Sequence, residues 1–145
     1  MKSKTVATWM ALAGGSLGLH RFYLRGWHDG WGWLHPAPTL IGLYGILRAR
    51  ELGLDDHLSW ALIPLLGVTI ASSMLCAIVY GLMPDDKWNR RFNADGSMSP
   101  PGGWGAVIGV VLALMLGAGV LMATIAFSGQ RWFEYQIEEA HKISR

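Results

Sequence analysis

The stretch Leu19-His20-Arg21-Phe22-Tyr23-Leu24-Arg25-Gly26 is a charged, aromatic segment between two apolar stretches of a length suited to a lipid bilayer. An arginine at the bilayer centre costs roughly 2.5–3.5 kcal/mol on insertion scales. Arg21 and Arg25 are therefore expected either at the membrane edge, where long side chains reach the headgroups, or inside the protein beside a partner. The first alternative makes this stretch a turn between membrane-spanning helices, and the second makes it a functional site.

The composition is that of a membrane protein. Of the 145 residues, 52% are hydrophobic and 15% are charged, whereas soluble domains carry about 25% charged residues. The eight tryptophans and nineteen glycines are types that membrane proteins favour at interfaces and at helix contacts. A net charge of +2 gives no indication of nucleic-acid binding. The single cysteine, Cys76, excludes an intrachain disulfide and is expected to be a packing residue.

Four apolar stretches approach the length of about 20 residues that a helix needs to cross a hydrocarbon core of ~30 Å. They are residues 5–24, 30–47, 58–83 and 104–128. Lys2 and Lys4 precede the first stretch as in a secretory signal peptide. No small-residue cleavage site precedes a polar start, however, so we expect this helix to be retained.

These stretches predict an all-α integral membrane protein, a bundle of four transmembrane helices made of two helical hairpins. Residues 1–50 form the first hairpin, with the His-Arg-Phe turn between its helices. Residues 51–128 form the second hairpin, with a polar loop at 84–103. Residues 129–145 form a short polar or amphipathic tail.

The distribution of Lys and Arg predicts which side of the membrane the termini occupy, because cytoplasmic loops carry an excess of these residues. With four crossings, one side would carry seven of them, namely Lys2, Lys4, Arg48, Arg50, Arg131, Lys142 and Arg145. The other side would carry five, namely Arg21, Arg25, Lys87, Arg90 and Arg91. We therefore expect both termini in the cytoplasm.

Small residues recur every four positions in the last apolar stretch, at Gly105, Gly109, Ala113 and Gly117. Such a stripe lets helix backbones approach closely, and lipid supplies no other strong drive for helix association. We favour a contact within the chain, and a contact in a homo-oligomer is the alternative. The tryptophans near the helix ends are expected to form an aromatic belt at the membrane surface.

The first 47 residues resemble the TM-two domain family. The resemblance rests on Lys2-Ser3-Lys4, the small-residue helix at 7–18, the turn from Gly18 to Leu24, and the following Gly26 and Gly30. It implies two transmembrane helices joined by a short loop that bears the His-Arg-Phe motif, and a location in a bacterial inner membrane. Arg25 departs from the family pattern, which often has glycine directly after Tyr-Leu.

The leading functional hypothesis is a non-enzymatic module that recognises a membrane protein partner or lipid headgroups. The residues expected to form its surface are His20, Arg21, Phe22, Tyr23 and Arg25, with His20 orienting the turn. Arg90-Arg91-Phe92 lies on the same predicted side and makes a second basic-aromatic segment. Neither a metal nor another cofactor is expected.

Two alternatives stay open. The first is a lipid- or metal-handling enzyme that uses His20, His28, His35 and Asp29, although their spacing matches no metal-ligand pattern. The second is a small channel lined by the glycine faces. A carrier is disfavoured because the third and fourth apolar stretches contain no charged residue.

Overall fold

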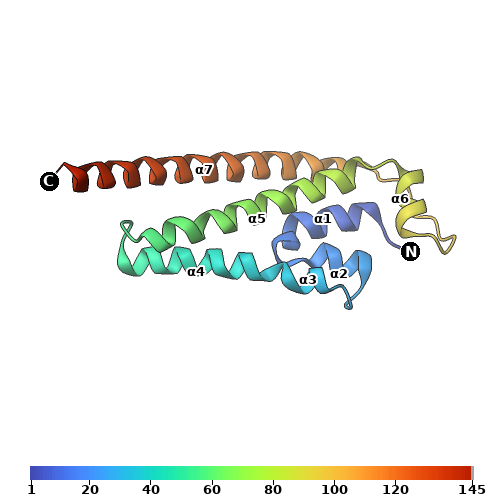
Figure 1. Cartoon of the computed structure of the whole chain (residues 1–145). Helices are drawn as coiled ribbons and strands as arrows, with labels where there is room; N and C mark the ends of the chain where they lie inside the picture. The colour runs from blue at the N-terminus through green and yellow to red at the C-terminus, as the bar shows by residue number, and fades with distance from the viewer. Residues whose placement is uncertain (145) are drawn as a thin grey trace.

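The computed structural model describes residues 1–144, in which every regular element is a helix and none is a strand. The elements in chain order are α1 (Lys4–Gly14), η1 (Gly15–Leu17), α2 (Leu19–Arg25), α3 (Gly30–Leu34), α4 (Pro36–Leu52), α5 (His57–Leu82), α6 (Asp85–Phe92) and α7 (Trp104–Ile143). The long helices α4, α5 and α7 lie side by side and make an elongated body, with α1, α2 and α6 gathered at one end (Figure 1).

The first expected membrane span is not one helix. α1 ends at Gly14, a short 3-10 turn follows, and Gly18 with φ 78° reverses the chain. α2 then runs back along α1, so that the Ser3 amide donates to the Tyr23 hydroxyl at 2.8 Å and the Lys2 ammonium donates to the Leu24 carbonyl. The 11 residues of α1 extend only ~16 Å, about half of a hydrocarbon core. The charged aromatic stretch is therefore a returning helix and not a turn between two crossing helices.

The second expected span corresponds to α3 and α4, which follow one another with a break at His35 and Pro36. Proline lacks the amide that would continue the hydrogen-bond ladder, and it is accepted here because it occupies the first position of α4. α4 packs closely on α5 at two glycines. A Cβ atom at Gly42 would lie 2.5 Å from the Leu66 Cβ, and one at Gly45 would lie 2.6 Å from the Leu62 Cβ.

Within the described residues, α5 and α7 are the two helices that are individually long and apolar enough to cross a membrane. They match the expected stretches 58–83 and 104–128. The predicted bundle of four transmembrane helices is thus only partly supported, since the all-helical fold is present and two of its helices qualify. The tail expected at 129–145 continues α7 without a break to Ile143, and the loop expected at 84–103 contains the helix α6.

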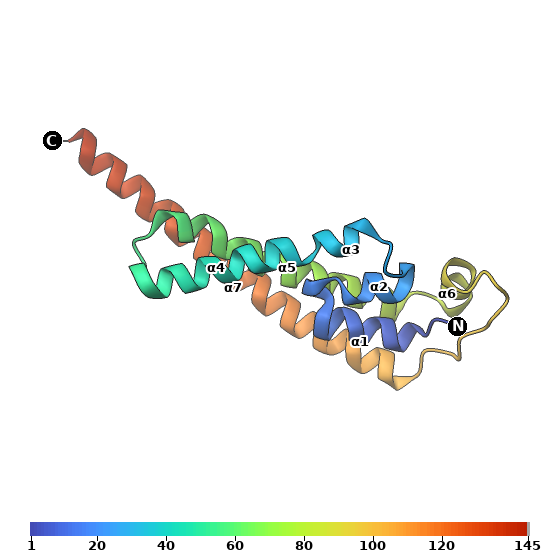
Figure 2. The same ribbon diagram turned by 90° about the horizontal axis from the view of Figure 1, so that it is seen from below.

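The termini lie at opposite ends of the molecule (Figures 1 and 2). The N-terminus is beside α6 and the α2–α3 connection, whereas the C-terminus lies beyond the α4–α5 connection. This differs from the expected arrangement, in which both termini share one side. The cause is the reversal at Gly18, which returns the chain to its starting end before α3 begins.

The small-residue stripe of α7 packs within the chain. Ala113 is fully buried, and added Cβ atoms at Gly105, Gly109 and Gly117 would meet Thr5, Thr8 and Met74 respectively, at 2.7–3.1 Å. The stripe therefore seats α7 against α1 and α5. Glycine and alanine allow this because their small side chains leave room for the neighbouring helix.

The α4–α5 connection is closed by Asp56, which gives a first testable prediction. Its carboxylate accepts two hydrogen bonds from Arg48, at 2.7 and 3.0 Å, and one from the Ser59 amide at 3.0 Å. These bonds lower the pKa of Asp56 from 3.8 to about 2, and the hydrogen bonds from Arg48 have the largest effect. Since the folded-state pKa is lowered, the ionised carboxylate stabilises the fold fully above about pH 4, and this stabilisation is lost as the pH falls towards 2.

Asp56→Asn is therefore expected to lower the midpoint of thermal unfolding at pH 6, and the difference from the wild type should narrow between pH 4 and pH 2. Circular dichroism in detergent micelles measures both midpoints. A difference that stays constant over this range would show that the carboxylate does not stabilise the fold through its charge.

Candidate functional site

A pocket of about 270 Å³ lies between α2, α5 and α6 at the end of the molecule that carries the N-terminus. Three arginines line it, namely Arg21 and Arg25 from α2 and Arg91 from α6. The rest of its wall is formed mainly by side chains of α5, namely Leu75, Cys76, Val79 and Tyr80, together with Leu24, Met83 and Phe92. The pocket therefore combines cationic groups with an apolar wall.

Arg21 and Arg25 reach this pocket because they are four residues apart and share one face of α2. Arg21 is held by Asp29, which accepts hydrogen bonds from its Nε at 2.8 Å and from its Nη2 at 3.2 Å. The hydrogen bond from Arg21 also holds the pKa of the Asp29 carboxyl below its usual value. Arg25 is exposed and makes no ion pair within residues 1–144. The charge of Arg21 is thus neutralised, and that of Arg25 is not.

Arg91 brings the third guanidinium from a different part of the chain. It is exposed, its Cζ lies 5.5 Å from the centroid of the Phe92 ring, and it makes no ion pair within the described residues. Phe92 packs on Trp88 with ring centroids 4.5 Å apart, and both rings contact Tyr80 of α5. These aromatic contacts fix the end of α6 beside α2 and α5.

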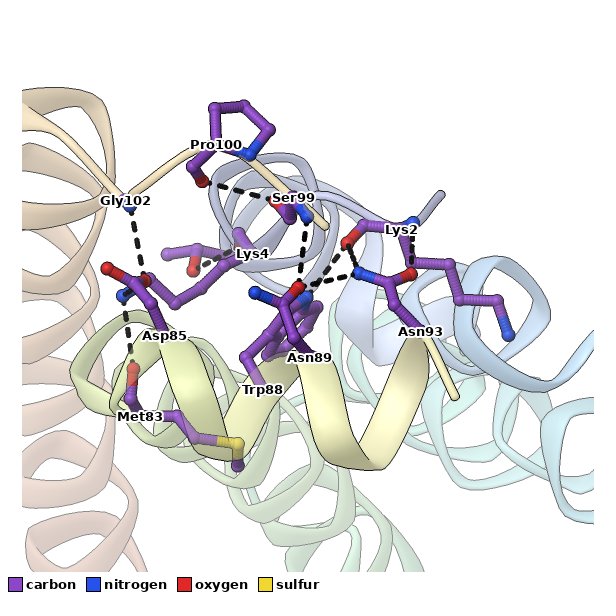
Figure 3. Close-up of polar contacts among 11 residues, drawn as sticks. Lys2, Lys4, Met83, Asp85, Trp88, Asn89, Asn93, Ser99, Pro100 and Gly102 are labelled. Atoms are coloured by element: carbon purple, nitrogen blue, oxygen red, sulfur yellow. Dashed lines mark hydrogen bonds and ion pairs between the residues drawn. The ribbon is translucent and has the colours of Figure 1, made fainter. Parts of the chain in front are cut away.

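The position of α6 depends on the N-terminal segment (Figure 3). The Lys2 carbonyl accepts hydrogen bonds from the Trp88 indole at 2.8 Å and from the Asn93 side chain at 3.1 Å, and the Lys2 amide donates to Asn93 at 2.6 Å. Asn89 accepts from Asn93 at 2.9 Å and from the Ser99 amide at 3.0 Å. α6 is therefore tied to both the first residues and the connection that leads to α7.

Lys4 completes this network. Its ammonium is buried, donates to the Met83 carbonyl at 3.0 Å and pairs with Asp85 at 2.6 Å. Asp85 also accepts from the Gly102 amide at 3.2 Å, and Lys4 lowers the pKa of this carboxyl. Lys2 and Lys4, expected as simple flanking charges, instead hold together the end of the molecule that contains the pocket.

The five residues predicted to form one surface point in different directions. Arg21 and Arg25 line the pocket, whereas Phe22 stacks on Trp27 at 5.1 Å and contacts Trp33 at 5.2 Å. The Tyr23 hydroxyl binds the N-terminal segment. His20 is buried at 2% exposure beside His35 and Tyr80, with ring centroids 5.6 and 5.8 Å away. The sequence analysis missed that Asp29 pairs with Arg21. It placed Arg91 on the same side as Arg21 and Arg25, and the structure adds that all three line one pocket.

The histidines of the alternative hypothesis are only partly brought together. His20 and His35 are neighbours, His28 is exposed in the α2–α3 connection, and Asp29 is occupied by Arg21. The Nδ1 atom of His20 is buried and has no hydrogen-bond partner within the described chain. Among residues 1–144, no three potential ligands from His, Cys, Asp and Glu lie close enough together to hold a metal ion.

Comparison with protein-family models, with curated proteins and with solved structures finds no match to this chain. The resemblance to the TM-two domain family therefore stays a prediction that rests on the residues of the first 47 positions.

Proposed function

We propose that the chain is a small, non-enzymatic, multi-pass membrane protein that recognises the anionic headgroup of a phospholipid in the pocket between α2, α5 and α6. The observation that supports this most directly is the meeting of Arg21, Arg25 and Arg91 above an apolar wall. This arrangement matches the two chemical parts of a phospholipid, the phosphate and the acyl chain.

The charges in the pocket suit a phosphate. Guanidinium groups bind phosphate through paired N–H donors, and this geometry makes arginine a better phosphate ligand than lysine at such sites. Arg25 and Arg91 have no carboxylate partner within residues 1–144, so their charges are available. Asp29 neutralises Arg21 and fixes its side chain beside the pocket. A single phosphodiester would therefore meet two uncompensated guanidinium groups.

The wall of the pocket suits an acyl chain. Leu75 and Val79 are exposed on α5 and lie one helical turn apart, so they extend the pocket along the helix axis. α5 has the length and composition of a membrane-crossing helix. A lipid whose phosphate lies between the arginines would place its chain along this face of α5, in the direction of the bilayer interior.

In a bilayer, the helices would make three membrane crossings and one re-entrant hairpin. α5 and α7 each cross, and α3 with α4 makes the third crossing. α1 and α2 enter and leave on the same side, a shape tolerated where protein covers the bent backbone. That backbone is covered, because the Thr39 hydroxyl donates to the Ser16 carbonyl at 2.6 Å and Gly18 lies against Gly32 and His35.

This arrangement changes the predicted orientation. Among the described residues, the end with the N-terminus now carries Lys2, Lys4, Arg21, Arg25, Lys87, Arg90 and Arg91, and the other end carries Arg48, Arg50, Arg131 and Lys142. The excess of positive charge favours a cytoplasmic N-terminus, and three crossings put the C-terminus on the opposite side. The resemblance of the first 47 residues favours a bacterial inner membrane as the location.

The proposal is tested by retention of lipid. The protein is purified in nanodiscs of phosphatidylcholine with one-fifth phosphatidylglycerol, then released and weighed by native mass spectrometry. We expect the wild type to retain phosphatidylglycerol, and Arg25→Gln/Arg91→Gln to retain at least tenfold less, because two charge-assisted contacts to one phosphate contribute more than about 1.4 kcal/mol together. The matched control is Arg50→Gln/Lys142→Gln, which removes the same charge from exposed positions at the other end.

Equal retention by the pocket variant and the wild type would exclude the pocket as the lipid site. Equal loss in the pocket and control variants would show that net charge alone attracts the lipid. If the wild type retains no lipid and instead carries an acidic protein that the arginine variant does not carry, the ligand of the pocket is a protein partner and not a lipid.

A further inference from the structure

The two connections α2–α3 and α4–α5 follow the same sequence pattern. Residues 21–33 read RFYLRGWHDGWGW and residues 48–60 read RARELGLDDHLSW. Aligned at a spacing of 27 residues, both have the pattern Arg-x4-Gly-x2-Asp-x3-Trp, with apolar residues at the position after the glycine and two positions before the tryptophan. We call residues 21–33 the first connector and residues 48–60 the second connector.

The backbones of the two connectors agree at the matched glycine and at the matched aspartate. Gly26 has φ 85° and ψ 176°, and Gly53 has φ 92° and ψ 173°. Asp29 has φ −74° and ψ 102°, and Asp56 has φ −73° and ψ 102°. The conformation of the glycines is one that other residues almost never adopt. The same residue is therefore needed at the same place in both connections.

The matched arginine–aspartate pairs and the matched tryptophans form the same bonds, whereas Asp56 alone also accepts from the amide three residues later, that of Ser59. Arg48 makes with Asp56 the same pair of hydrogen bonds, Nε to Oδ2 and Nη2 to Oδ1, that Arg21 makes with Asp29. The Trp33 indole donates to the Trp27 carbonyl at 2.9 Å, and the Trp60 indole donates to the Leu54 carbonyl at 2.6 Å. In each connector the acceptor is the residue directly after the glycine. The two connectors are thus copies of one structural unit.

The copies occupy opposite ends of the helical body and point in opposite directions (Figure 1). α3 and α4 join them, and the 23 residues from Gly30 to Leu52 measure ~34 Å at the rise of an α-helix. A hydrocarbon core is ~30 Å thick. The spacing of the connectors is therefore that of the two surfaces of a bilayer.

Each copy exposes apolar residues at matched positions. Trp27 and Leu54 are 69% and 64% exposed, and Trp31 and Leu58 are 66% and 49% exposed. Each copy also places its arginine five residues before the glycine, about 7 Å along the helix axis, and there the aspartate neutralises it. Apolar side chains beside a neutralised ion pair suit the boundary between headgroups and acyl chains.

We propose that the two connectors are duplicated membrane-interface units, each of which inserts its exposed apolar side chains into the headgroup boundary of one leaflet, with the two copies in opposite leaflets. The partner of this surface is the phospholipid bilayer itself, independent of headgroup charge. The inference rests on the membrane location in the proposed function, but not on the anion pocket.

The test uses matched positions in the two copies. In a Cys76→Ala background, Trp27→Cys and Leu54→Cys carry a nitroxide spin label in vesicles of pure phosphatidylcholine, and depth is measured by power saturation with oxygen and a nickel chelate. We expect both labels at the headgroup boundary and at equal depth. Val68→Cys, exposed in the middle of α5, is the control and should lie deep in the hydrocarbon.

A label in water or at the depth of position 68, at either connector, would overturn the proposal. Sidedness is measured by labelling His28→Cys and Asp55→Cys, which are matched and exposed, with an impermeant maleimide in oriented vesicles. Labelling from opposite sides is expected, and labelling from one side would overturn the proposal. Because these vesicles contain no anionic lipid, this test can succeed where the lipid-retention test fails, and the reverse.

Discussion

Gly42→Ala is expected to lower the free energy of unfolding by about 2 kcal/mol, because an added Cβ at this position meets the backbone of α5. That atom would lie 2.6 Å from the Leu66 amide nitrogen and 2.9 Å from its Cα. Neither atom can move without shifting the helix. The cost of this overpacking outweighs the gain of roughly 0.5–1 kcal/mol that alanine normally brings in place of a helical glycine.

The matched control is Gly119→Ala. Gly119 also lies inside a long helix, α7, but an added Cβ there meets nothing within 4 Å. This variant should be neutral or more stable by roughly 0.5–1 kcal/mol. Unfolding of both variants by sodium dodecyl sulfate in mixed micelles, followed by circular dichroism, gives the two free energies. If the two variants behave alike, α4 does not pack on α5 as closely as the structure has it.

A cysteine in a short N-terminal tag is expected to react with an impermeant maleimide from the same side of the membrane as His28→Cys, in an all-or-none manner. The reason is the reversal at Gly18, after which α2 returns to the N-terminus and places the α2–α3 connection beside it. A cysteine in a C-terminal tag should react from the opposite side. The experiment needs the Cys76→Ala background, because Cys76 is the single cysteine of the chain.

Four crossings would give a different pattern. The two tags would then react from one side and His28→Cys from the other. That result would restore the arrangement predicted from hydropathy and would exclude a re-entrant hairpin of α1 and α2. Asp55→Cys serves as a control, since either arrangement places it opposite His28→Cys.

The sequence predicted the bounds of the long apolar helices closely, but it predicted one continuous helix over residues 5–24, where the structure has two helices and a reversal. α5 begins one residue before the expected stretch 58–83 and ends one residue before its end, and α7 begins at the expected residue. These runs are uncharged and longer than 20 residues, so only a helix satisfies their backbone in lipid. The first stretch passed the same length criterion because hydropathy does not register a chain reversal. The signal for it was Gly14-Gly15-Ser16-Leu17-Gly18, which also fits a small-residue packing face.

Of the five residues predicted to form one surface, two line the pocket. Arg21 and Arg25 stood out because two charges in an apolar context need an explanation, and they do line the pocket. Phe22, Tyr23 and His20 were grouped with them by adjacency in the sequence. A helix separates such neighbours by about 100° each, so these residues point to three other environments. Residues three or four apart share one face of the helix, and Arg21, Leu24 and Arg25 line the pocket in this way.

The sequence by itself determined the helical class, the long helices α5 and α7 and the small-residue stripe that seats α7, because each follows from a local pattern of hydropathy and side-chain size. It also contained the repeated Arg-x4-Gly-x2-Asp-x3-Trp pattern, whose meaning becomes clear when the two backbones are compared. Only the tertiary structure decided that α2 returns to the N-terminus, and that Arg91 joins Arg21 and Arg25 from 66 or more residues away. The first feature depends on the contacts of Lys2 and Ser3 with α2, and the second on the fit of α6 to Lys2, Lys4 and Tyr80. These are contacts between distant segments that no local pattern encodes.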